Sequence, residues 1–134
     1  MIINVFPKGL KKILQAGINM EGADIKALLL TSSYTFDVTD EFISDLTGEA
    51  TGYTRQACSL TAAADTDNPY AYLTAAGVLT FPTVTGAIRY VVIAKDTGIA
   101  GTSPLILCID LEAATTLTGQ NCKTTFTGNV LEIG

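Results

Sequence analysis

The sequence contains no histidine and no tryptophan. Without histidine, the chain has neither a Ser-His-Asp nor a Cys-His catalytic arrangement, and it offers no imidazole ligand to a metal ion. It also lacks the side chain that most often changes its charge near neutral pH. These absences disfavour acid–base catalysis and favour a packed domain that acts by contact.

Basic residues are few, with 8 lysines and arginines against 13 aspartates and glutamates and a net charge of −5. Binding to nucleic acid needs clustered positive side chains, so we expect no nucleic-acid partner. The three cysteines, Cys58, Cys108 and Cys122, are an odd and irregularly spaced set, which is unlike a disulfide framework. Cys108 lies within an apolar run, which predicts a buried free thiol.

Long hydrophobic runs are missing as well. No apolar stretch approaches the roughly 20 residues that a membrane-spanning helix needs, so we expect no membrane contact. The apolar residues at the start precede the lysines, the reverse of a secretion signal. Hydrophobic residues nevertheless make up 48% of the chain and charged residues 16%, which excludes intrinsic disorder. A length of 134 residues fits one folded domain.

The first segment, residues 1–22, is predicted to be an N-terminal helical arm. Leu10, Ile13 and Leu14 recur at helical spacing, a proline precedes them and a glycine follows them, which predicts a short amphipathic helix over residues 8–16. Its apolar face has two possible uses. It packs on its own domain, or it docks on a neighbouring subunit.

The remaining residues, 23–134, are predicted to form a mainly β domain, an antiparallel β-sandwich, because short alternating runs are separated by turn residues. A second short helix is expected over residues 39–46. Pro82 places one strand at a sheet edge, since proline cannot donate to a central ladder. The expected strands cover residues 24–31, 53–60, 79–84, 87–94, 104–111, 124–126 and 130–133.

The strongest prediction is a hairpin of residues 87–94 and 104–111 around an extended loop. The second of these strands is apolar on both sides, so it needs a cover on each face. A second sheet is expected to supply one cover. The N-terminal helix or a neighbouring protomer is expected to supply the other.

The residues most suited to contact a partner lie on the helix, on the loop of the hairpin and at the two arginines. The loop, residues 96–103, is rich in small residues and lies where a structural protein would reach a neighbour. An arginine at the rim of an interface can grip a carboxylate with two hydrogen bonds. The candidate partner-binding residues are Leu10, Ile13, Leu14, Arg55, Arg89, Ile99 and Thr102.

Five acidic residues crowd one stretch without a basic residue between them: Asp37, Asp40, Glu41, Asp45 and Glu49. A glycoside hydrolase needs two carboxyl groups about 5–10 Å apart across a cleft. The alternative is that these side chains cap a helix and face solvent, which already accounts for Asp40 and Glu41. We favour the second interpretation and expect no catalytic residue.

Two other stretches are considered as ligand sites. Residues 65–68 begin like a calcium loop, but Tyr70 and Ala76 stand where an EF-hand needs glycine and glutamate. A polar turn that ends at Pro69 is the favoured interpretation. Residues 98–101 lack the ending of a phosphate-binding loop. We therefore expect no metal ion and no cofactor.

Six stretches stand out when they are taken together: Gly9–Asn19, Asp24–Phe36, Asp40–Leu46, Gly52–Gln56, Ile88–Gly98 and Pro104–Leu111. In this order they resemble small virion structural proteins of tailed bacteriophages. The resemblance implies a non-enzymatic particle component, located in the virion and assembled in the cytoplasm of the bacterial host. It further implies a homo-oligomer that contacts the major capsid protein or other virion proteins. A capsid decoration or cement protein is the first expectation, and a tail, neck or head-fibre component is the alternative.

Overall fold

Strands dominate the computed structural model of the chain, in which 54% of the residues are in strands. The structure describes residues 1–58, 60–64, 67, 71–75, 77–126 and 129–133. A mainly β, antiparallel fold is therefore confirmed, while the stacking of two sheets as a sandwich stays a prediction. The sequence also predicts a loop over residues 61–69 and a turn at residues 128–129. The first part of that loop prediction is wrong, because residues 60–64 form a strand. Residues 65–66, 68–69 and 128 lie outside the described residues.

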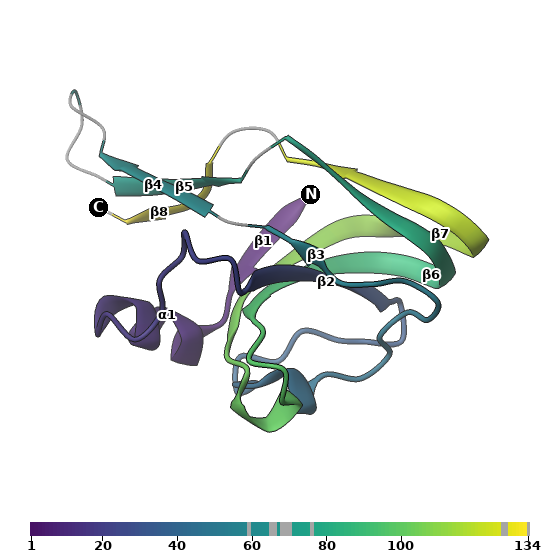
Figure 1. Ribbon diagram of the computed structural model, residues 1–134, viewed down its shortest axis with the longest axis horizontal. Helices are drawn as coiled ribbons and strands as arrows, with labels where there is room; N and C mark the ends of the chain where they lie inside the picture. The colour runs from purple at the N-terminus through teal and green to yellow at the C-terminus, as the bar shows by residue number, and fades with distance from the viewer. Residues whose placement is uncertain (59, 65–66, 68–70, 76, 127–128, 134) are drawn as a thin grey trace.

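The strands form a five-stranded and a three-stranded sheet, and both are antiparallel in the pairs described (Figure 1). The larger sheet has the order β1-β7-β6-β2-β3, with β1 Ile2–Val5, β2 Ile25–Thr31, β3 Gln56–Ala57, β6 Val78–Lys95 and β7 Leu105–Thr125. The smaller sheet has the order β4-β5-β8, with β4 Leu60–Ala64, β5 Ala71–Ala75 and β8 Asn129–Ile133. Helical segments are α1 Pro7–Leu14 and the short 3-10 turns η1 Ile43–Asp45 and η2 Ala100–Thr102.

The predicted hairpin is confirmed, and it is longer than expected. Strand β6 has 18 residues and β7 has 21, and they pair along both lengths. Figure 1 shows the hairpin curving from the loop at the bottom of the view to the three-stranded sheet at the top. Pro82 lies at a register shift, in a part of β6 that pairs with β7 while β2 pairs only from Ile88 onwards. The proline therefore avoids a two-sided ladder.

Both faces of the central strands are buried, as the apolar pattern predicts. Along β2, Ala27 and Leu29 belong to a first cluster of core residues, whereas Leu28 and Leu30 belong to a second cluster on the opposite face. Because side chains alternate across a strand, each face needs its own cover.

The chain itself supplies both covers. The curved end of the β6–β7 hairpin places Phe81 and Val84 in the first cluster. The segment of residues 32–49 places Tyr34 and Ile43 in the second cluster. Neither cluster therefore requires a neighbouring protomer to be closed.

The prediction of a helix over residues 39–46 is wrong, because only the single 3-10 turn η1 forms there. The Asp45 carboxylate accepts hydrogen bonds from the N–H groups of Glu41 and Phe42, both at 2.9 Å. The backbone of this segment also bonds to the chain just before β7, through Ile43 N–H to the Ser103 carbonyl at 2.9 Å. These side-chain and tertiary hydrogen bonds compete with helix formation and outweigh the capping pattern.

Two other strand predictions need correction. Of the strand expected over residues 53–60, only Gln56–Ala57 pairs with β2, and Leu60 already begins β4. Residues 2–5, which the sequence pattern assigned to the helical arm, instead form β1 and pair with β7. This short, mostly apolar segment gains ladder hydrogen bonds with the buried strand β7. The local sequence pattern does not reveal this long-range pairing.

Helix α1 lies close against β7, and Gly9 sets the distance. Gly9 is buried, and a Cβ atom built on it would lie 1.8 Å from the Leu105 carbonyl oxygen. Leu10 and Ile13 are half-buried against the first cluster. The close approach of the two backbones therefore brings the apolar face of the helix onto its own domain.

We expect Gly9→Ala to destabilise the fold by about 1–3 kcal/mol, because the added methyl group overpacks the contact with β7. This loss outweighs the better helix propensity of alanine, which is worth about 1 kcal/mol. Gly101→Ala is the matched control, since nothing lies within 4 Å of a Cβ atom there. Chemical denaturation checks both variants, and equal stability of the two would contradict the close packing of α1.

Candidate functional site

The loop between β6 and β7, residues 96–103, is held in shape by its own hydroxyl groups; we call it the tip loop. The buried Ser103 hydroxyl accepts a hydrogen bond from Thr97 N–H at 3.0 Å and donates one to the Ile99 carbonyl at 2.8 Å. The Thr97 and Thr102 hydroxyls lie 2.7 Å apart. Ile99 is 65% exposed. The tip loop thus presents an apolar side chain on an ordered backbone.

Arg55 connects the base of the tip loop to the body of the fold. Its Nη1 donates to Asp96 Oδ2 at 3.1 Å, and Asp96 Oδ1 accepts the N–H of Gly98 at 2.9 Å. The Nε and Nη2 atoms of Arg55 donate to the two Glu49 oxygens at 3.0 and 2.8 Å. The structure therefore brings together two parts of the predicted surface, Arg55 and the loop with Ile99.

The same contacts shift the acidities of the two carboxyl groups. Burial alone would raise the pKa of Glu49, but hydrogen bonds from Arg55 and Tyr53 bring it below its ordinary value. Burial would likewise raise the pKa of Asp96, and the Gly98 N–H and the Arg55 guanidinium together lower it. Both carboxylates are thus stabilised in the charged form that holds the loop.

Arg89 lies apart from this group. Its Nε and Nη2 donate to the two oxygens of Asp110 at 3.0 and 3.2 Å, and its guanidinium lies 5.4 Å from the centre of the Tyr90 ring. The two-bonded carboxylate contact that the sequence suggested for an interface is therefore made within the chain. A role for Arg89 in partner binding stays a prediction.

The three predicted residues of α1 divide between two environments. Leu10 and Ile13 pack on the first cluster, whereas Leu14 is 68% exposed. On the polar side, Lys12 Nζ lies 2.7 Å from a Glu41 oxygen, and Lys8 Nζ lies 3.6 Å from the other. The helix is thus tied to its own domain on both sides, and only Leu14 remains available for a neighbour.

The acidic stretch of residues 37–49 is engaged in structural contacts. Asp37 accepts the N–H and the hydroxyl of Thr39 at 2.8 and 2.7 Å. Asp40 accepts the Tyr34 hydroxyl at 2.8 Å, and burial raises the pKa of Asp40. The other three carboxylates, described above, hold a turn, helix α1 and Arg55. This arrangement favours the structural interpretation of the acidic stretch over a catalytic carboxylate pair.

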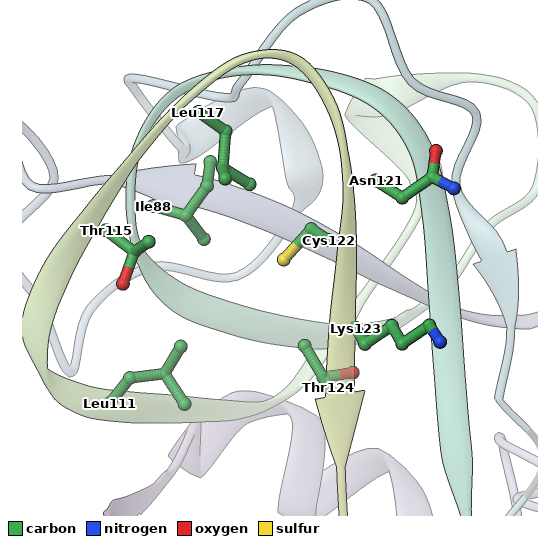
Figure 2. Close-up of a pocket in the computed structure, with 8 residues that line it drawn as sticks. All are labelled: Ile88, Leu111, Thr115, Leu117, Asn121, Cys122, Lys123 and Thr124. Carbon is green, nitrogen blue, oxygen red and sulfur yellow. The ribbon is translucent and has the colours of Figure 1, made fainter.

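A pocket of about 250 Å³ lies along the curved end of the hairpin and was missed by sequence reasoning. Its lining residues are Ile88, Leu111, Thr115, Leu117, Asn121, Cys122, Lys123 and Thr124 (Figure 2). Figure 2 shows Cys122 turned towards the apolar side chains, with Asn121 and Lys123 turned away. Burial raises the pKa of the Cys122 thiol, which disfavours the reactive thiolate. The pocket is therefore a mainly apolar hollow in which Cys122 is not an activated nucleophile.

No protein-family model, curated protein or solved structure matches this chain in the comparisons made. Within the described part of the chain, no helix is both long and apolar enough to span a membrane. The same residues contain no group of three or more cysteine, aspartate or glutamate side chains placed to hold a metal ion. The geometry of the tip loop is thus the main basis for assigning a function.

We expect Ser103→Ala to lower stability by about 1–3 kcal/mol, because it leaves the Thr97 N–H without its acceptor. The Ile99 carbonyl keeps the hydrogen bond from the Thr102 N–H at 3.1 Å. Ser44→Ala is the matched control, since Ser44 is exposed and makes no hydrogen bond within the described residues. Thermal unfolding checks the pair. Hydrogen exchange of the Thr97 amide should also accelerate in Ser103→Ala, and an unchanged rate would contradict the hydroxyl-held loop.

Stability should fall with pH in the acidic range partly through Glu49. Its pKa in the folded chain lies below the ordinary value of 4.5. Its contribution is therefore present above pH 4.5 and is lost as pH falls through the folded pKa. We expect Glu49→Gln to flatten the stability–pH curve below pH 4.5, measured by urea denaturation at a series of pH values. Parallel curves for the two proteins would show that Glu49 does not carry this linkage.

Proposed function

We propose that this chain is a non-enzymatic structural protein of a bacteriophage particle, namely a capsid decoration protein that binds the assembled head and stabilises it. The observation that carries the proposal is the tip loop, which holds Ile99 in an exposed and ordered position. The engagement of the acidic stretch in structural contacts supports a function by contact over one by catalysis.

The physical basis of such stabilisation is mass action. A protein that binds the assembled shell, and not its separated subunits, shifts the equilibrium towards assembly. A loop that is ordered before binding loses little conformational freedom when it docks, so more of its contact energy appears as affinity. Ile99 would then act as the apolar anchor, with Thr102 beside it in the same loop and Arg55 fixing the base.

The proposal includes a homo-oligomer located in the virion, with the major capsid protein or another virion protein as partner. In its fold, the curved β6–β7 hairpin and the three-stranded sheet would stack as a β-sandwich. Leu14 would supply a second contact near the end of α1, since it is the exposed member of the three helix residues.

The test uses particles that lack this protein and are then decorated with purified variants. We expect Ile99→Asp to bind such particles at least about tenfold more weakly than the wild type, because a charge would be buried at the anchor position. Particles with the wild-type protein should also resist heating better than undecorated particles.

Val38→Asp is the matched control, because Val38 is 58% exposed and lies outside the tip loop. It should bind like the wild type. Equal binding of the wild type, Ile99→Asp and Val38→Asp would show that the tip loop is not part of the contact. Equal heat resistance of decorated and undecorated particles would contradict a stabilising role.

A further inference from the structure

The five-stranded sheet has two outer edges, and they differ in their hydrogen bonding. Along β2, the groups that point away from β6 are used: Thr31 N–H donates to Gly48 O at 2.8 Å, and Leu29 O accepts Ala50 N–H at 2.9 Å. Residues 48–58 thus close this edge. The opposite edge is β1, which pairs with β7 on one side.

The register shows which groups of β1 point outwards. Phe6 N–H donates to Ile106 O at 3.0 Å, in line with the pairing of Asn4 with Cys108. Because hydrogen-bonded pairs alternate along an antiparallel ladder, even-numbered residues bond to β7 and Ile3 and Val5 direct their N–H and C=O groups away from it. Within the described residues, no hydrogen bond engages these outward groups.

This edge is short, since β1 has four residues, but it lacks the other usual features that prevent strand pairing. Natural edges are often interrupted by a bulge, a charged side chain or a proline. The exposed flanks of the β6–β7 hairpin have register shifts near Thr83 and Gly119, where φ is positive. By contrast, residues 2–6 contain no charge and no proline, and the pairing of β1 with β7 is regular.

We infer that two copies of this chain pair through β1, antiparallel and about a two-fold axis at Asn4. In this register Ile3 faces Val5 of the partner subunit, and each of the two equivalent pairs exchanges two backbone hydrogen bonds. Apolar residues face apolar residues, and the Asn4 side chains meet at the axis, where amides can bond to each other.

A second copy fits this edge because the sequence of β1 is complementary to itself when reversed about Asn4. Such a contact is isologous and closed, so it yields a dimer and not a fibre. The inference rests on the proposed function only in that the latter includes a homo-oligomer. It concerns the isolated chain and can be tested without any particle.

The direct test is amide hydrogen exchange by NMR over a range of protein concentrations. Exchange at Ile3 and Val5 should slow as the concentration rises, whereas Asn4, bonded to β7 in every state, should stay protected throughout. Sedimentation should show a dimer over the same range. Concentration-independent exchange at Ile3 and Val5, or a monomer throughout, would overturn the inference.

Two pairs of variants locate the contact. Ile3→Pro removes the outward N–H and keeps the bonds to β7, and Ile3→Ala is its control for the loss of the side chain. Asn4→Asp opposes two like charges at the axis, and Asn4→Ser is its neutral control. We expect Ile3→Pro and Asn4→Asp to weaken the dimer at least about tenfold relative to their controls. A dimer that persists in both would lie on another surface.

The two proposals fail separately. A β1-paired dimer that does not bind particles would leave this inference intact and contradict the proposed function. A monomer that decorates particles would overturn this inference and the homo-oligomer in the proposed function, while it would leave the decoration of the particle supported.

Discussion

The structure depends on one constraint, the burial of the central strands β2, β6 and β7 on both faces. Strands of this kind are unstable as a layer unless each face is covered. The chain meets the requirement with two very different elements, a hairpin that curves back over one face and the irregular segment of residues 32–49 over the other. Polar contacts hold the segment and the tip loop in place: Asp45 shapes the turn of the segment, Glu41 ties it to α1, and Arg55 fixes the tip loop.

The polar groups described above are engaged within the chain. Carboxylates that hold turns and ion pairs have their charges already satisfied, and the Cys122 thiol is kept protonated by burial. Two surfaces are our candidates for function. The tip loop offers Ile99 on an ordered backbone, and the outer edge of β1 offers the unpaired groups of Ile3 and Val5. We propose the first surface for contact with a different protein and the second for contact with a second copy.

The sequence allowed the central hairpin and α1 to be predicted, because continuous apolar runs and helical spacing are local signals. It did not reveal that β7 continues to Thr125, since the threonine-rich residues after Leu111 have no regular alternation and pair with β6 through register shifts. The pocket at Cys122 was missed for this reason. Arg55 and Ile99 were both predicted as contact residues. Their connection through Asp96 was not, because the Arg55–Asp96 pair is 41 residues apart in the chain and depends on the tertiary fold.

The central claim is that this chain acts by contact on an assembled particle. The most direct test is its copy number in purified virions, measured by quantitative mass spectrometry against the major capsid protein. A decoration protein on the shell lattice should be present in a number comparable to that of the shell subunit. A far smaller number would contradict decoration and indicate the tail, neck or a head fibre, and complete absence from the particle would contradict the virion function altogether.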